Sequence, residues 1–367
     1  MCYNQLESFG GRKLSLNSHS GLTLVGYYGY NNLGDDLLLL SSLEILDEIN
    51  YKEKIRVTSD GNFDVLLKFF PKSLNIEKIE RLPLKVLKAI KNSKMTVFGG
   101  GNLFQDETSY RSFLYYYYLA KTTLKQGKKF LMMSQGFGPF KNSHANQKLD
   151  AILRNSNTFG IMRDKHSFDY FRNISNNCCL ETDYGPYFLK KSGFFTKSII
   201  NEKDPELAVI IPKSGICFEN IVGSLKKIGI KRICAISFYN HHDETKRKEV
   251  EEAAKKFKME IIEPPYATEE IINKIANSSI VISERLHGVI LSISTYTPFV
   301  WCNNEKINNF VHSFDPNCQL NFISNDESID QIIKNSINYD YTKISDKYFQ
   351  KLETTISCCK DTLKKLI

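Results

Sequence analysis

The sequence has little that would place it in a membrane or in an oxidising compartment. No run of about 18 apolar residues, the length that a membrane-spanning helix needs, occurs in its 367 residues. The first twenty residues lack the apolar core of a secretory signal. The nine cysteines are odd in number, none is spaced as C-x-x-C, and the adjacent pairs at 178–179 and 358–359 would form only strained vicinal bridges. We therefore expect free thiols and a cytoplasmic protein.

Signals for nucleic acid or metal are also sparse. The net charge is +8, from 49 Lys and Arg against 41 Asp and Glu, and the densest basic segment, 246–248, is followed at once by three glutamates. Nucleic acid is therefore not an expected partner. His241, His242 and Asp243 are adjacent, so their side chains point in different directions, and no further ligands are spaced to complete a metal site. We expect neither a metal ion nor a cofactor.

The chain does contain enough apolar sequence for two packed cores. Hydrophobic residues make up 42%, and 367 residues exceed what one core usually supports. Short apolar runs alternate with segments of helical period, which predicts parallel sheets with crossover helices. The expected strands are 22–25, 55–58, 95–98, 130–133, 159–162, 180–182, 208–211, 232–236, 259–262, 280–283 and 299–302. The expected helices begin at about Asp35 and then cover 110–125, 218–228, 245–257, 268–276, 286–294 and 346–366.

This pattern restarts after the polar stretch 201–205. The predicted fold is therefore α/β, with two tandem Rossmann-like domains at 20–200 and 205–335. The Lys-rich helical segment at 340–367 is expected to pack back across the two domains. Ligands bind beyond the carboxyl ends of parallel strands, so the expected site is the cleft between the domains.

Three glycine-rich segments follow expected strands of the first domain. The first, GYYGYNNLGDD at 26–36, has glycines three and then five residues apart, so it is not the G-x-G-x-x-G dinucleotide motif. Its Asp35 could cap the following helix, and an ordinary capped turn would also explain the segment. The second, GGGNLFQD at 99–106, could turn backbone N–H groups toward an anion before a helix begins, with Asp106 in reach of the same cleft. The third, SQGFGP at 134–139, is also explained by turn chemistry alone.

Basic residues follow three other expected strands. Arg163, in MRDKHS, could hold a phosphate or carboxylate bidentately, although a salt bridge with Asp164 or with the other domain is an alternative. In SERLHG at 283–288, Arg285 and His287 stand at a helix start, where N–H groups and a cation together select an anion. A histidine there can also donate a proton, and a structural arginine beside a hydrogen-bonded histidine is the plainer alternative. Lys306 follows the last expected strand.

Taken in order, GYYGYNNLGDD, GGGNLFQD, QGFGP, MRD-x-x-S and SERLHG resemble the motifs of the polysaccharide pyruvyltransferases, which make ketal-pyruvate groups on bacterial cell-wall polysaccharides and exopolysaccharides. The resemblance covers about 26–310. It implies a two-lobed fold like that of the GT-B glycosyltransferases. It also implies phosphoenolpyruvate as donor co-substrate and a sugar acceptor carried on a lipid or a nucleotide. A lipid-linked acceptor would bring the protein to the inner face of the cell membrane.

The resemblance also suggests roles for individual residues. The family's phosphoenolpyruvate-binding Arg-Leu-His matches 285–287, its R-D arginine matches Arg163, and its lysine matches Lys306, although Asn-Glu replaces Asp-Pro before that lysine. His287 is the expected acid for the methylene carbon and Asp106 the expected base for the sugar hydroxyl, with Asp35 as the alternative base. The further residues expected to bind substrate are Gly29, Asn32, Gly99, Gly100, Gly101, Asn102, Gln135, Gly136, Leu286 and Gly288.

Two other functions fit the same sequence. A GT-B glycosyltransferase that uses a nucleotide sugar would share the architecture, and a non-catalytic protein could bind an anionic metabolite at the same place. The acceptor sugar and the oligomeric state stay open. The tyrosines at 115–118 could stack on a sugar, but two of four consecutive helical residues must face inward, so core packing is the expected role.

Overall fold

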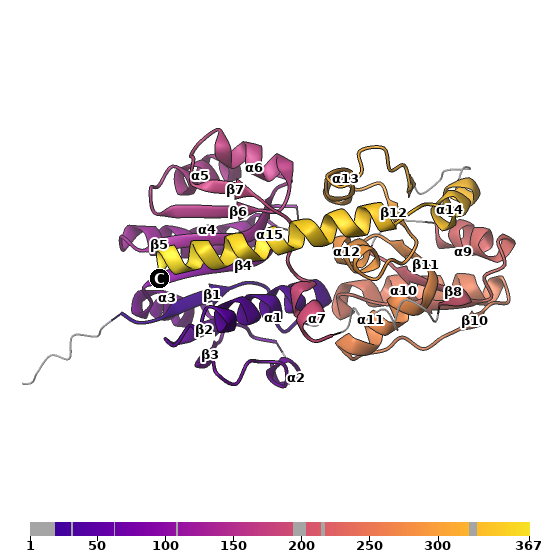
Figure 1. The fold of residues 1–367 in the computed structure, drawn as a ribbon, viewed down its shortest axis with the longest axis horizontal. Coiled ribbons are helices and arrows are strands. Elements are labelled where there is room, and N and C mark those ends of the chain that lie inside the picture. The colour runs from indigo at the N-terminus through magenta and orange to yellow at the C-terminus, as the bar shows by residue number, and fades with distance from the viewer. Residues whose placement is uncertain are drawn as a thin grey trace, which may run out of the picture.

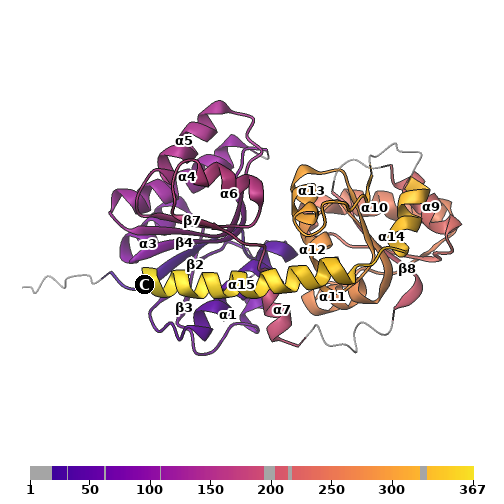
Figure 2. The same cartoon turned by 45° about the horizontal axis from the view of Figure 1, so that its top comes forward.

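The computed structural model describes residues 19–30, 32–61, 63–107, 109–193, 203–213, 217–322 and 329–367, and gives only the backbone of 64–65 and 240–242. Two α/β lobes lie side by side, and one long C-terminal helix runs along both of them (Figures 1 and 2). No helix in the described ranges is both long enough and apolar enough to cross a bilayer.

The first lobe is built on a seven-stranded parallel sheet in the order β3-β2-β1-β4-β5-β6-β7. The strands are β1 (Leu22–Val25), β2 (Ile55–Thr58), β3 (Ile76–Ile79), β4 (Met95–Phe104), β5 (Lys129–Phe137), β6 (Thr158–Met162) and β7 (Cys178–Leu180). The helices are α1 (Leu33–Glu48), α2 (Asp64–Leu67), α3 (Pro83–Asn92), α4 (Tyr110–Lys125), α5 (Ser143–Leu153), α6 (Lys165–Arg172) and α7 (Tyr187–Lys191). The strand order reverses between β1 and β4, which is where open parallel sheets bind ligands.

The second lobe repeats this plan on a six-stranded parallel sheet in the order β10-β9-β8-β11-β12-β13. The strands are β8 (Asp204–Ile211), β9 (Arg232–Ala235), β10 (Glu260–Ile261), β11 (Ser278–Ser283), β12 (Phe299–Cys302) and β13 (Asn321–Phe322). The helices are α9 (Phe218–Lys227), α10 (Asn240–Lys256), α11 (Thr268–Asn277), α12 (Leu286–Ser294), α13 (Glu305–His312) and α14 (Ile329–Ile337). Here the order reverses between β8 and β11. The predicted α/β fold with two Rossmann-like units is confirmed.

Helix α1 is buried on nearly all sides, which explains its unusual sequence. Its leucine-rich run has no polar face, and such a helix is stable only inside a protein. It packs against β4 on one side and against α7 and the C-terminal helix on others. As a result, the residues at its N-terminus are held firmly where the two lobes meet.

The C-terminal helix α15 (Thr342–Leu366) is amphipathic and joins the lobes. Its 25 residues span about 37 Å. The buried positions Ile344, Tyr348, Leu352 and Leu363 lie on one face. This face packs on α12 of the second lobe and on α1 of the first, and the predicted packing across both domains is observed.

Several predicted bounds change in the structure. Strand β4 runs to Phe104 and β5 to Phe137, so both continue through their glycines, and α10 begins five residues before the predicted position 245. The elements that were not predicted are strands β3 and β13 and helices α2, α3, α5, α7, α13 and α14. In α4, Tyr116 and Tyr117 are buried and Tyr118 is exposed, as core packing requires.

We expect the α15 interface to be a main source of stability. Leu352→Ala removes a fully buried side chain and should lower the free energy of unfolding by about 2–4 kcal/mol. Gln350→Ala, on the exposed face two residues away, should change it by less than about 0.5 kcal/mol. Urea denaturation of both variants measures the difference, and equal midpoints would mean that α15 contributes little to the fold.

Candidate active site

A cavity of about 670 Å³ lies between the lobes, beyond the last residues of β1, β6, β8, β11 and β12. Both lobes line it, so the predicted interdomain position is observed. The residues that were predicted from the sequence and line this cavity are Asn32, Asp35, Gly101, Asn102, Arg163, Arg285, Leu286, His287 and Lys306.

A buried carboxylate contacts one basic side chain from each lobe at this cavity. Asp183 follows β7 and is fully buried, and its Oδ2 accepts a hydrogen bond of 3.0 Å from Nη1 of Arg163. The same oxygen lies 3.6 Å from Nε2 of His287, at the start of α12. Burial alone would raise the pKa of Asp183, but the neighbouring His287 and Arg163 lower it to about 2. Asp183 therefore stays ionised and orients both side chains.

Arg285 is held in a similar way within the second lobe. It is the N-cap residue of α12, and its backbone N–H donates to Oγ of Ser283. Its guanidinium donates through Nε and Nη2 to the two carboxylate oxygens of the fully buried Asp243. This two-point contact fixes the plane of the guanidinium, which is about one quarter exposed. The inference that an arginine stands beside a helix N-terminus holds, and the structure adds its carboxylate partner.

Lys306 forms a contact between the lobes. It lies in the first turn of α13, and its Nζ donates to Oε2 of Glu107 in the first lobe over 2.9 Å. Burial lowers the pKa of Lys306, while the Glu107 carboxylate acts in the opposite direction. The ammonium therefore lies at the boundary of the two lobes, beside a second, smaller cavity that Arg163 and Gly136 also line.

Asp35 is the carboxylate of α1 that faces the cavity. Its backbone is in the first turn of α1, and it accepts a hydrogen bond from the side chain of Asn32. Burial is the main cause that raises its pKa to about 6, although His287 and Arg163 partly oppose this effect. A carboxyl group with a pKa near 6 can take up a proton close to neutral pH.

Two glycines make room for these groups. A β-carbon at Gly34 would overlap the imidazole of His287, and one at Gly101 would lie 3.2 Å from Oδ1 of Asp35. Gly101 also has φ +94°, which favours glycine. The approach of α1 to α12 therefore depends on Gly34, because only a residue without a side chain leaves space for the ring.

The role predicted for the glycine triplet is partly wrong. The triplet does not lead into a helix but lies inside β4, where Gly99 pairs with Met133 of β5. Its first two members do not line the cavity, because Gly99 packs against Tyr28 and Gly100 against Leu38. Close packing of α1 on β4, rather than contact with an anion, explains why glycine is needed at these two positions.

Asp106 was predicted to be the base, but it does not lie at the cavity where a base is needed. Its carboxylate accepts hydrogen bonds from the backbone N–H groups of Lys141 (2.6 Å) and Asn142 (2.8 Å), and it does not line the cavity. It therefore stabilises the loop after β5. Of the two candidate bases, the structure brings only Asp35 next to His287.

The remaining predicted residues shape the site without lining the main cavity. Gly29 has φ +79°, and its N–H donates to Asp36, so it forms the turn before α1. Gln135 is buried and accepts a hydrogen bond from the backbone of Leu103. Gly136 lies against Arg163, and Gly288 packs against Ser283. The side chains of His241 and His242 are outside the described part of the chain, so the expectation about metal there stays a prediction.

One end of the cavity is aromatic, which was not predicted. Tyr27 stacks on Tyr30 with centroids 4.2 Å apart, and its hydroxyl lies 2.6 Å from that of Tyr239 in the second lobe. Arg81 lies over the rings of Tyr27 and Tyr115, and donates to the hydroxyl of Tyr116. An antiparallel bridge between Asn32 and Tyr239 joins the lobes at the same place.

Several residues of the site were not predicted, and only some of them have a recognisable signal in the sequence. Asp183 stands in TDYGP, three residues after a strand, so its position at a strand end was a usable signal. Asp243 and Glu107 act through partners 42 and 199 residues away, and no local pattern marks them. Tyr239 likewise shows its role only when the lobes are placed together.

The two-lobed fold is that of the GT-B proteins. The UDP co-structure of S. aureus MnaA is similar, with a TM-score of 0.62, 12% identity and coverage of 94% of this chain and 97% of that one. Anabaena HepE in complex with UDP and glucose has a TM-score of 0.60, 10% identity and coverage of 94% and 99%. The UDP-GlcNAc 2-epimerase of Neisseria meningitidis, bound to UDP-GlcNAc, has a TM-score of 0.60, 12% identity and the same coverage. At these identities the likeness shows the fold alone.

The sequence itself identifies the family. The family model for polysaccharide pyruvyl transferase matches residues 32–306, a range that contains Asp35, Arg163, Asp183 and the whole of SERLHG. This chain belongs to the polysaccharide pyruvyl transferase family, as the ordered motifs indicated. A search of curated proteins finds no significant match.

The contact between Gly34 and His287 can be tested by stability alone. Alanine usually stabilises a helix relative to glycine by about 0.5–1 kcal/mol. Gly34→Ala should instead lower the free energy of unfolding by about 1–3 kcal/mol, because its methyl group overlaps the imidazole. In a His287→Ala background the same change should be neutral or stabilising. Urea denaturation of the unchanged protein, the two single variants and the double variant completes this double-mutant cycle. If Gly34→Ala lowered the free energy of unfolding equally with and without His287, the imidazole would not be the obstacle.

Proposed function

We propose that this chain transfers pyruvate from phosphoenolpyruvate to a sugar as a ketal, in the synthesis of a cell-surface polysaccharide. The observation that carries the proposal is the convergence of Arg163, Arg285, His287 and Lys306 on one cavity between the lobes. Membership of the pyruvyl transferase family supports the transferred group. Phosphoenolpyruvate is a co-substrate in this proposal, which includes neither a cofactor nor a metal ion.

The cations suit a small molecule that carries two anionic groups. Each has a carboxylate partner that orients it, yet donors remain: Arg163 uses one Nη1–H on Asp183, and Lys306 uses one of three N–H bonds on Glu107. The first N–H groups of α12 add partial positive charge from the same direction. Phosphate and carboxylate, a few ångströms apart in phosphoenolpyruvate, match this arrangement.

His287 is the proposed acid. Proton transfer from its imidazolium to the methylene carbon makes C2 electrophilic, and a sugar hydroxyl then adds at C2. The ionised Asp183 lies beside the ring and supplies a counter-charge. Loss of phosphate and attack by a second hydroxyl close the cyclic ketal, so the products are the pyruvylated sugar and inorganic phosphate.

Asp35 is the proposed base for the sugar hydroxyl. Its carboxylate faces the cavity close to His287, and its raised pKa makes it a stronger base than an exposed aspartate. In this assignment Asp106 has no chemical role, because backbone N–H groups engage both of its oxygens.

The aromatic end of the cavity is the proposed acceptor side. Tyr27, Tyr116 and Tyr239 offer ring faces and hydroxyl groups, which suit the apolar faces and hydroxyls of a sugar. Leu82 and Leu84 follow Arg81 in the sequence and are 51% and 82% exposed. Exposed leucines beside lysines of α3 would suit an acceptor carried on a lipid at the membrane surface. The UDP-bound proteins of similar fold make a nucleotide-linked acceptor the second choice.

The direct experiment supplies the protein with phosphoenolpyruvate and a panel of lipid-linked, nucleotide-linked and free glycans. We expect release of phosphate together with the mass increment of a pyruvate ketal on one class of acceptor. His287→Asn should lower kcat by about 10²–10⁴-fold. His144→Asn, which changes an exposed histidine outside the cavity, is the matched control. Consumption of a nucleotide sugar as donor, with phosphoenolpyruvate unused, would refute the proposal in favour of glycosyl transfer.

The pH profile distinguishes the two candidate bases. A base must be ionised, so kcat/KM should fall about tenfold per unit as the pH drops below the pKa of Asp35, which is about 6. Asp35→Asn should abolish this acidic limb along with most of the activity. Asp106→Asn should keep the acidic limb of the profile at the same pH. If Asp106→Asn abolished the limb and Asp35→Asn did not, Asp106 would be the base.

A further inference from the structure

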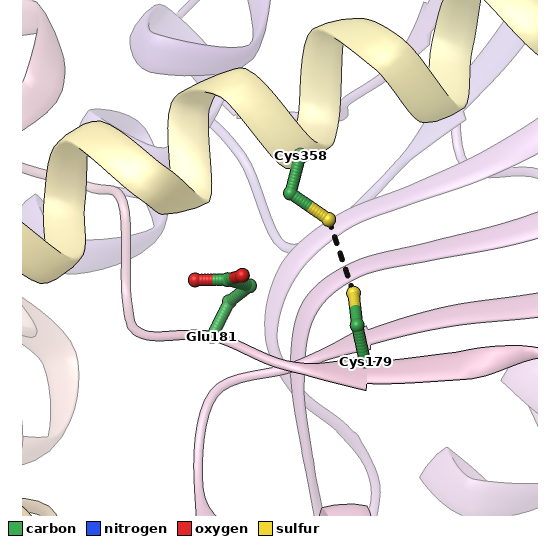
Figure 3. A group of neighbouring side chains, drawn as sticks. All are labelled: Cys179, Glu181 and Cys358. Atoms are coloured by element: carbon green, nitrogen blue, oxygen red, sulfur yellow. Dashed lines mark hydrogen bonds between the residues drawn. The ribbon is translucent and has the colours of Figure 1, made fainter.

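A pair of thiols lies outside the cavity and has no part in the proposed reaction. Cys179 belongs to β7, the edge strand of the first sheet, and Cys358 belongs to α15. Figure 3 shows their side chains pointing toward each other, with the two Sγ atoms 3.1 Å apart. The eight cysteines in the described part of the chain are all free thiols. This pair thus joins segments that are 179 residues apart.

A metal ion does not fit this pair well. Glu181 lies close enough to be a third ligand. Its Oε2, however, already accepts hydrogen bonds from Thr354 (3.0 Å) and Thr355 (3.2 Å) and pairs with Lys351 (2.9 Å). Two thiolates on a tetrahedral zinc ion, with Zn–S of ~2.3 Å, would also lie about 3.8 Å apart. The observed separation of 3.1 Å is shorter than this distance, and the two sulfurs face each other as an S–S bond of about 2.05 Å would require.

The surroundings favour reaction of these thiols with a small disulfide. The hydrogen bond between the two thiols lowers the pKa of Cys358 and raises the pKa of Cys179, so Cys358 is the thiol that ionises first. Both thiols are partly exposed. A cavity of about 200 Å³, lined by Cys179, Thr362 and Lys365, opens beside Cys179, and Lys365 could attract an anionic molecule.

We propose that Cys179 and Cys358 form a reversible disulfide that ties α15 to β7 when the protein meets a low-molecular-weight disulfide. The Cys358 thiolate attacks one sulfur of the small disulfide and releases one small thiolate. Cys179 then passes its proton to the small thiolate released in the first step and attacks Sγ of Cys358, which releases the second small thiolate. Two protein thiols are thereby oxidised, and the small disulfide is reduced to two thiols.

The disulfide would strengthen the attachment of α15 to the segment that connects the two lobes. From β7 the chain runs directly to Asp183, whose backbone oxygen accepts a hydrogen bond of 2.9 Å from Tyr348 of α15. Thr355 of α15 accepts from the backbone N–H of Thr182, and Ser345 donates to Ile293 of the second lobe. A disulfide at Cys358 therefore fastens the helix that spans both lobes to the segment that carries Asp183. This inference is independent of which reaction the cavity performs.

The test equilibrates the full chain with mixtures of reduced and oxidised glutathione and maps disulfides after alkylation of free thiols. We expect one intramolecular link, between the peptides of Cys179 and Cys358, that dithiothreitol reverses. The oxidised protein should melt a few degrees higher, because the bond closes a long loop in the unfolded chain. Cys179→Ser and Cys358→Ser should each abolish both effects. Cys178→Ser, which alters the adjacent thiol in the same strand, should retain them.

Two results would overturn the proposal. The first is that Cys179 and Cys358 carry only separate glutathione adducts at equilibrium, or that links to Cys178 form in equal yield. The second is that the purified protein binds one zinc ion per chain, which both serine variants lose, and which protects the pair from oxidation. In that case the pair with Glu181 would be a metal site instead.

Discussion

The structure depends most on one buried charge, the carboxylate of Asp183. It contacts Arg163 from its own lobe and His287 from the other, so a single group fixes the two halves of the cavity relative to each other. A fully buried carboxylate is costly unless it is paired, and here burial and pairing act in opposite directions, with the net result that it stays ionised. Its backbone is held in turn by Tyr348 of α15. The helix, the lobe boundary and the site thus form one connected unit.

The other cations of the cavity follow the same principle. Asp243 orients Arg285, and Glu107 orients Lys306, so each positive charge has a fixed direction before it meets a ligand. Such preorganisation lowers the cost of ordering long side chains when an anion binds. For the proposed anionic substrate, the available contacts are therefore the remaining N–H donors and the start of α12, rather than an unpaired charge.

The sequence predicted correctly those features that depend on residues close together in the chain. Apolar runs and helical periods located most strands and helices, and residues just after strands located Asp35, Arg163 and His287. It was misleading at Gly99 and Gly100, because a glycine needed for close packing against Leu38 and Tyr28 looks the same as one needed for contact with an anion. It was also misleading at Asp106, whose partners are N–H groups of a loop 35 residues away. Asp243 could not be predicted at all, since its role exists only once α10 and α12 are side by side.

The contacts that join the lobes also build the cavity. Asp183 with His287, Glu107 with Lys306, and Asn32 with Tyr239 all cross the boundary within the cavity wall or directly behind it. Opening the lobes would therefore separate His287 from its carboxylate and from Asp35 at the same time. The proposed acid, His287, and the proposed base, Asp35, therefore depend on the same contacts between the lobes. Because α15 packs on α12 and on α1, it holds the elements that carry His287 and Asp35 in the same relative position as these contacts do.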